Sequence, residues 1–114
     1  MTFEFPAEEP VGYSIRRRDG ADPPELALEG ELDLRAASEL REALLEALSE
    51  SGGHVALDMT ALSFLDSTII SVLIMAKKRA EAAGGEVRLR NVSDRVKRTF
   101  SITGITELFS IEES

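Results

Sequence analysis

The sequence predicts an α/β domain: an N-terminal antiparallel hairpin followed by parallel strands, forming a small mixed β-sheet packed with helices. The first third of the chain alternates apolar and polar residues with a period of two, which is typical of half-buried strands. The remainder alternates strand-like and helix-like segments, and this order favours parallel strands joined by helical crossovers. With 114 residues, of which 43% are hydrophobic and 30% charged, the chain has the size and composition of one globular domain.

The hairpin is predicted from two strands around a short polar loop. Residues 1–10 are acidic, contain two prolines and are interpreted as a flexible lead-in, so the folded domain is expected to span residues 11–114. Apolar and polar residues alternate over 11–16 and again over 26–32. The segment 19–24 between them contains glycine, aspartate and two prolines, which are typical of turns.

Three helices and two further strands are predicted after the hairpin. Residues 35–50, 67–84 and 94–102 carry apolar side chains at helical spacing, and glycines follow each segment. Short apolar runs at 54–59 and 86–90 predict buried parallel strands. The predicted core consists of Leu28, Leu40, Leu44, Val55, Leu57, Leu73, Ala76, Val87, Leu89, Val96 and Phe100.

Composition excludes several classes of function. The net charge is −8, and nucleic-acid binding depends mainly on neutralising phosphates with lysine and arginine, so no direct nucleic-acid partner is expected. The basic clusters at 16–18, 77–79 and 95–98 are interpreted as solvated faces of a strand and two helices. There is no cysteine and one histidine, His54, so neither a zinc site nor any other metal or cofactor is expected.

The chain shows no signal for a membrane. Its longest strongly apolar stretch, residues 69–76, is much shorter than the roughly 20 residues that span a bilayer. The N-terminus lacks a basic region followed by an apolar run, so it does not resemble a secretory signal. We expect a cytoplasmic protein with no membrane partner.

A candidate site is predicted at the carboxyl ends of the strands, where open α/β sheets gather their functional residues. Asp33, Asp58 and Asp66 come at or just after such ends. Asp58 is expected to order the turn after its strand by hydrogen bonding. Asp33 precedes a predicted helix and is a candidate cap for it.

Three segments resemble motifs of the STAS family. Residues 30–33 (GELD) resemble a motif near the start of STAS domains, and residues 57–68, ending in Leu-Asp-Ser-Thr, resemble its central motif. Residues 89–92, with 102–105 and 108–109, are similar to its C-terminal third. Because these motifs occur in the expected order, the chain is identified as resembling a STAS protein of the anti-sigma factor antagonist type.

The resemblance implies a phospho-switched binding module and not an enzyme. In that branch the serine after the motif aspartate is phosphorylated by a partner that is both anti-sigma factor and serine kinase, and a PP2C-type phosphatase reverses the reaction. The unphosphorylated form binds the anti-sigma factor and releases the sigma factor. By position, the acceptor here is Ser67, with Thr68 as the second candidate, and Asp33 and Asp66 belong to the partner-binding surface.

The position of Ser67 fits this role on physical grounds. It lies at the predicted start of a helix, where free N–H groups and the helix dipole favour negative charge. A serine at such a position is also a preferred N-cap, so a purely structural role for Ser67 is the competing interpretation.

The sequence departs from the family pattern after Thr68. The family commonly has glycine directly after this Ser-Thr pair, often as Gly-Leu-Gly, whereas this chain has Ile69, Ile70 and Ser71. If the two isoleucine side chains are exposed, they belong to the partner-binding surface; if they are buried, they pack the core more tightly. The departure also leaves open whether a kinase recognises Ser67.

The sequence also bears on two other classes of function. Phospho-aspartate receivers need an acidic pair after the first strand, where this chain has Arg16, Arg17 and Arg18; no hydrolase motif is present either. The alternative that stays open is a non-switching STAS subunit of a stress-sensing or lipid-transport assembly. An adjacent gene for an anti-sigma kinase would favour the switch, and a transporter operon the alternative.

Overall fold

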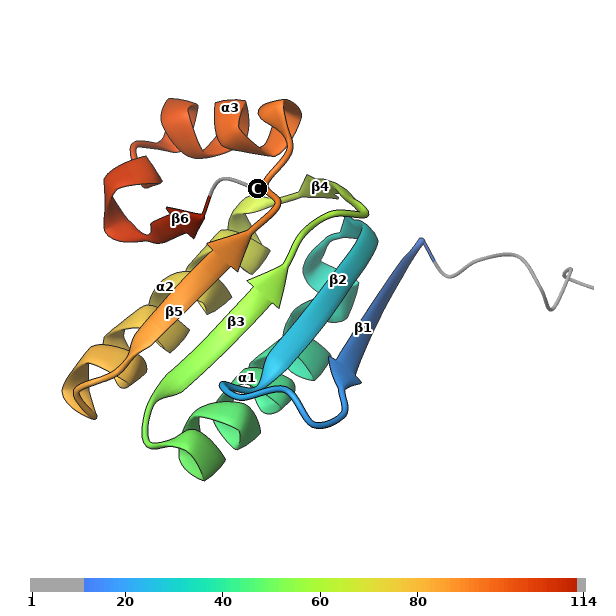
Figure 1. Ribbon diagram of the computed structural model, residues 1–114. Coiled ribbons are helices and arrows are strands. Elements are labelled where there is room, and N and C mark those ends of the chain that lie inside the picture. The colour runs from blue at the N-terminus through green and yellow to red at the C-terminus, as the bar shows by residue number, and fades with distance from the viewer. Residues whose placement is uncertain (1–11, 113–114) are drawn as a thin grey trace, which may run out of the picture.

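The computed structural model describes residues 12–112 and shows a mixed sheet with two helices against one of its faces (Figure 1). In order across the sheet, the strands are β1 (Tyr13–Arg18), β2 (Glu25–Leu32), β3 (His54–Asp58), β5 (Glu86–Arg90) and β6 (Ser110–Glu112), and β4 (Leu62–Leu65) pairs with β2. The helices are α1 (Ala37–Ser51), α2 (Ser67–Ala82) and α3 (Asp94–Thr103), with 3-10 turns η1 (Leu34–Ala36) and η2 (Thr106–Leu108).

The predicted fold class is confirmed. Strands β1 and β2 form the antiparallel hairpin, with Tyr13 opposite Gly30, and β3, β5 and β6 run parallel to one another. The three helices lie within a few residues of their predicted bounds. Helix α1 starts at Ala37 because the turn η1 occupies the residues just before it. The predicted lead-in at residues 1–10 lies outside the described residues.

The sequence analysis did not predict two short strands, β4 and β6. Strand β3 pairs with the first half of β2 and β4 pairs with the second half, so one edge of β2 serves two successive strands. The four residues of β4 enclose the exposed pair Ser63 and Phe64, which hides its strand character in the sequence. Strand β6 has only three residues, which are too few to show a period in the sequence.

Gly30 occupies a position that no other residue fits. Its φ is +82°, and a Cβ atom added there would lie 2.1 Å from the carbonyl oxygen of Gly12. The β2–β4 register shifts between Gly30 and Glu31. The glycine of the GELD segment therefore lets the hairpin close while β2 changes partner.

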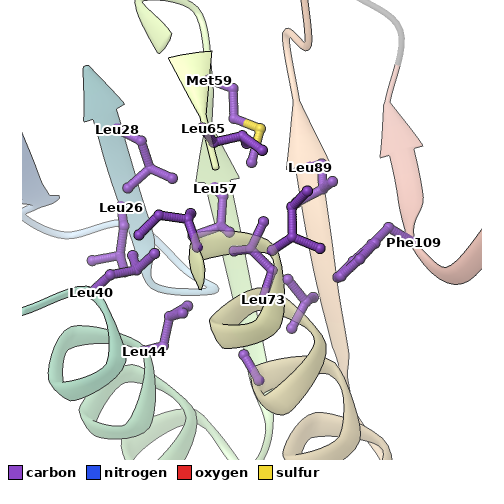
Figure 2. Close-up of a cluster of buried hydrophobic side chains, with 14 of the residues drawn as sticks. Leu26, Leu28, Leu40, Leu44, Leu57, Met59, Leu65, Leu73, Leu89 and Phe109 are labelled. Atoms are coloured by element: carbon purple, nitrogen blue, oxygen red, sulfur yellow. The ribbon is translucent and has the colours of Figure 1, made fainter. Parts of the chain in front are cut away.

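The hydrophobic core lies between the sheet and helices α1 and α2. Figure 2 shows leucines of β2, β3 and β5 pointing toward Leu40 and Leu44 of α1 and Leu73 of α2. Near β6, the rings of Phe100 and Phe109 stack with centroids 6.4 Å apart. Every residue of the predicted core is buried.

The opposite face of the sheet is covered by charges. Arg18 on β1 lies 2.7 Å from the carboxylate of Asp58 on β3, and it also pairs with Glu25 on β2. Arg90 on β5 joins Glu25 at 2.7 Å and Glu112 on β6 at 3.0 Å. These ion pairs cross from strand to strand, so the open face carries a continuous network of opposite charges.

Candidate functional site

The carboxyl ends of β2 and β4 bring two predicted site residues to one edge of the sheet. Leu32 and Leu65 are register partners, so the residues that follow them, Asp33 and Asp66, leave neighbouring strands together. The backbone N–H of Asp66 donates to the carbonyl of Leu32 at 3.2 Å. The structure thus places Asp33, Asp66 and Ser67 in adjoining loops.

Asp66 holds these loops together with its side chain. Its Oδ1 accepts a hydrogen bond from the N–H of Ile69 at 3.0 Å and caps α2. Its Oδ2 accepts from the N–H of Leu34 at 3.1 Å, in the turn η1. One carboxylate therefore satisfies backbone donors of two elements that are distant in sequence.

Ser67 is the first residue of α2 and is exposed. The competing interpretation, that Ser67 caps the helix, is wrong, because the cap is Asp66. Among the described residues, the Ser67 hydroxyl makes no hydrogen bond; the Ser67 carbonyl accepts one from Ser71 at 3.1 Å. Thr68 is exposed beside it in the same first turn. The two hydroxyl groups lie where the helix dipole and free N–H groups favour negative charge.

Asp33 lies close by but has a local partner. Its Oδ1 accepts from the N–H of Arg35 at 2.9 Å and from Arg35 Nε at 3.0 Å. These hydrogen bonds from Arg35 lower the pKa of Asp33. Asp33 caps the turn η1 and not α1, which corrects the predicted cap. The Asp33–Arg35 pair presents both signs of charge at the edge of the site.

Ile69 and Ile70 do not belong to the surface of the site. Ile69 is fully buried and Ile70 is 7% exposed, so both side chains pack in the core. Their predicted contact with a partner is corrected, because both side chains are buried. Ile69 stands where the family commonly has glycine, and its β-branched side chain packs in the core. The departure from the family pattern changes packing and leaves the outer surface of the first turn unaltered.

Two exposed apolar residues border the site and were missed from the sequence. Leu34, whose N–H is bound by Asp66, is 69% exposed. Phe64, two residues before Asp66, is 43% exposed. In the sequence, the exposure of Leu34 is indicated by its position between the charged residues Asp33 and Arg35, before the apolar face of α1 begins. Large apolar side chains beside a polar site are common where a protein partner binds.

A model of the STAS domain family matches residues 14–114, nearly the whole chain. The chain belongs to the STAS family. Its likeness to the anti-sigma factor antagonist type is confirmed by curated relatives of that name. The anti-sigma-B factor antagonist of Bacillus subtilis (strain 168) is 35% identical over 82 residues, covering 72% of this chain and 74% of the relative. That of Listeria monocytogenes is 31% identical over 102 residues, covering 90% and 89%.

Solved structures share the STAS fold. The anti-sigma factor antagonist SpoIIAA in its unphosphorylated form superposes with a TM-score of 0.75 at 21% identity, covering 89% of this chain and 88% of the other. The phosphorylated form of the Bacillus cell fate determinant SpoIIAA gives a TM-score of 0.67 at 19% identity, covering 89% and 91%. These likenesses agree with the mixed sheet and three helices described above.

The third strand-end aspartate of this STAS domain, Asp58, lies in the ion-pair network of the open face. Its Oδ1 accepts from the N–H of Thr60 at 3.0 Å, the Thr60 hydroxyl at 2.6 Å and the Asn91 amide at 3.0 Å. Burial opposes ionisation, but hydrogen bonds from Thr60, Asn91 and Arg18 outweigh it and hold the pKa of Asp58 well below its usual range. Asp58 orders its turn, as predicted, and is not part of the Ser67 site.

The described part of this STAS domain offers little for other chemistry. Nowhere in residues 12–112 do three histidine or acidic side chains converge in a way that suits a metal ion. Within the same residues, no helix is both long and apolar enough to cross a membrane. The arrangement around Ser67 presents exposed hydroxyl groups, a capped helix start and bordering apolar side chains, which suit contact with another protein.

Proposed function

We propose that this STAS protein is an anti-sigma factor antagonist switched by phosphorylation of Ser67. In its unphosphorylated form it binds an anti-sigma factor that is also a serine kinase, and the sigma factor is released. The partner transfers phosphate to Ser67, with Thr68 as the second candidate, and a PP2C-type phosphatase removes it. The chain itself supplies no catalytic group. The proposal places this exchange in the cytoplasm, without direct contact with nucleic acid or membrane.

The observation that carries the proposal is the division of roles between Asp66 and Ser67. Because Asp66 caps α2, the helix does not depend on the Ser67 hydroxyl, which is exposed and available for modification. A phosphate on Ser67 adds roughly −1.5 to −2 charges at a helix N-terminus, where negative charge is tolerated. The fold is therefore expected to survive phosphorylation.

A bound partner responds differently to the same phosphate. A surface matched to a neutral hydroxyl, to Leu34 and to Phe64 would have to accommodate a dianion beside the Asp66 carboxylate. The resulting repulsion and desolvation oppose binding. Modification would thus change the affinity for the partner while the fold stays intact.

The printed names of relatives support the antagonist role. The curated relatives are named anti-sigma-B factor antagonists, and SpoIIAA has been solved in both phosphorylated and unphosphorylated forms. The non-switching alternative rested on the isoleucines after Thr68. Since Ile69 and Ile70 are buried, they do not alter the surface that a kinase would meet.

The proposal is tested by separating folding from binding. A pull-down with wild-type protein identifies the anti-sigma factor, which is then titrated by calorimetry against Ser67→Ala and Ser67→Glu. Ser67→Ala should bind like wild type and lose less than about 0.5 kcal/mol of stability, because Asp66 provides the cap. Ser67→Glu should stay folded but bind at least about tenfold more weakly, or about 1.4 kcal/mol.

Two controls sharpen this test. Ser49→Glu adds the same charge at an exposed position near the C-terminal end of α1 and should leave binding unchanged. With labelled ATP and the isolated kinase, Ser67→Ala should abolish phosphate transfer while Thr68→Ala retains it. Tight binding of Ser67→Glu, or transfer to Ser67→Ala, would contradict the assignment of Ser67.

A further inference from the structure

A groove on the outward face of α2 is a second feature of this domain that suits a partner. It has a volume of about 430 Å³ and is lined by Ser71, Ile74, Met75, Lys78 and Arg79. These residues recur at the spacing of one helix face, on the side turned away from the buried Leu73 and Ala76. The groove therefore opens to solvent.

The groove is apolar in its middle and cationic at one end. Ile74 and Met75 are half-buried, whereas Lys78 and Arg79 are exposed. Within residues 12–112, the side chains of Lys78 and Arg79 have no ion-pair or hydrogen-bond partner. By contrast, the adjacent Lys77 is paired with Glu81 at 2.8 Å. These two neighbouring cations give one end of the groove a local positive charge on a protein of net charge −8.

The groove continues the surface that carries Ser67. Ser67, Ser71, Ile74 and Lys78 follow one another at intervals of four, three and four residues, so they share one side of α2. At 1.5 Å per residue, Lys78 lies about 16 Å from Ser67 along the helix axis. A single segment of a partner lying along α2 can therefore contact both ends.

We propose that this groove binds an acidic segment of the protein partner, with an apolar side chain against Ile74 and Met75 and carboxylates facing Lys78 and Arg79. The identity of that partner as the anti-sigma factor rests on the function proposed above. Two cations contribute only about 1 kcal/mol each at an anionic membrane, and the net charge of −8 opposes approach to such a surface. A protein segment that combines carboxylates with an apolar side chain matches both properties of the groove.

An acidic segment also gives a physical reason why phosphorylation of Ser67 would weaken binding of the partner. A phosphate on Ser67 would add negative charge to the same side of α2 on which the partner's carboxylates lie. Repulsion then acts between phosphate and partner, in addition to the lost fit at the hydroxyl. The free cations favour the acidic segment, and the phosphate opposes it.

The groove is tested first without any natural partner. A synthetic peptide of about 12 residues, with leucines flanked by glutamates, is titrated into ¹⁵N-labelled protein and followed by NMR. Amide shifts should concentrate at Ser71, Ile74, Lys78 and Arg79 and should shrink as salt is raised. The double variant Lys78→Gln/Arg79→Gln should lose them. The matched variant Arg95→Gln/Arg98→Gln, which removes two exposed cations from α3, should keep them.

Several results would overturn this inference. Equal shifts with a peptide in which lysine replaces glutamate would show that charge plays no part. Shifts elsewhere on the domain, or none at all, would remove the groove as a site. Sedimentation of the protein with phosphatidylglycerol vesicles, lost in Lys78→Gln/Arg79→Gln, would assign the groove to a membrane.

The second test uses the anti-sigma factor from the pull-down. Lys78→Gln/Arg79→Gln should weaken its binding about tenfold and reduce the salt dependence of the dissociation constant. Arg95→Gln/Arg98→Gln should bind like wild type. If the groove variant binds normally while Ser67→Glu does not, the acidic-segment inference fails and the proposed switch stands. If peptide binding is confirmed but no anti-sigma factor binds, the groove stands and the proposed function fails.

Discussion

The two faces of the sheet exclude water by different means. On the face covered by α1 and α2, Leu57 of β3 is fully buried among apolar side chains. On the open face, Ala56 of the same strand is also fully buried, and Asp58 is 7% exposed, although neither helix lies there. Arg18 has to cross β2 to reach Asp58, and its apolar stem passes over the sheet on the way.

One sheet can thus be shielded from water on both faces although helices pack against only one of them. The covered face is stabilised by burial of apolar area, which tolerates no charge. The open face is stabilised by arginine stems and by ion pairs that satisfy Glu25 and Asp58. Because the charges of the open face are already paired with one another, that face offers a partner less than the free hydroxyl and cation groups of α2.

The largest effect is expected on the covered face. Leu57→Ala should lower the free energy of unfolding by about 2–5 kcal/mol, through lost burial and the cavity left behind. Urea denaturation measures it. Leu34→Ala is the matched control: the same substitution at a side chain that is 69% exposed should cost less than about 0.5 kcal/mol. A similar loss for both variants would mean that the covered face is not tightly packed.

A smaller effect that depends on pH is expected on the open face. Asp58→Asn should cost about 1–2 kcal/mol at neutral pH, because its ion pair with Arg18 is lost. Since the folded-state pKa of Asp58 is lowered, its contribution is present above the unfolded value near 4 and is lost as the pH falls further. Denaturation between pH 7 and pH 2 should therefore show wild type and variant converging in acid. A constant difference would place the effect in packing and not in charge.

The smallest effect is expected at the rim of the open face. Arg88 pairs with Glu86 at 2.7 Å and with Glu112 at 3.4 Å, but these side chains are well exposed. Solvent and salt screen such pairs, so Arg88→Ala should change stability by less than about 1 kcal/mol in thermal denaturation. A loss as large as that of Asp58→Asn would show that the open-face network acts as one unit.

The sequence predicted the covered face of the sheet but not the ion pairs of the open face, because the arginines at 16–18 were interpreted as a solvated face, whereas Arg18 pairs with Glu25 and Asp58. Val55 and Leu57 were assigned to the core, and Asp58 to an ordered turn, from the sequence alone. Strand β4 was missed because four residues are too few to show a period, and because its pairing depends on the register shift after Gly30. That shift is a tertiary feature without a local signal apart from the glycine.

The Ser67 site was predicted in position but not in detail. The motif placed Asp33, Asp66 and Ser67 in neighbouring loops, and the structure brings these loops together. Serine and aspartate are both good caps, so the sequence did not distinguish which residue caps α2. The burial of Ile69 and Ile70 depends on how α2 rotates against the sheet, which short apolar runs leave open.

The shared edge of β2 has a consequence for the order in which the chain folds. Pairing of β2 with β3 must close a long stretch of chain that includes α1, and this step carries most of the loop-closure entropy. Strand β4 follows β3 after only residues 59–61, so its docking on the second half of β2 adds little further entropy. Once β2 and β3 are paired, bringing Asp33 and Asp66 together therefore costs little further entropy, although the two residues are 33 positions apart. We therefore expect the Ser67 edge to open and close locally while β2 and β3 stay paired.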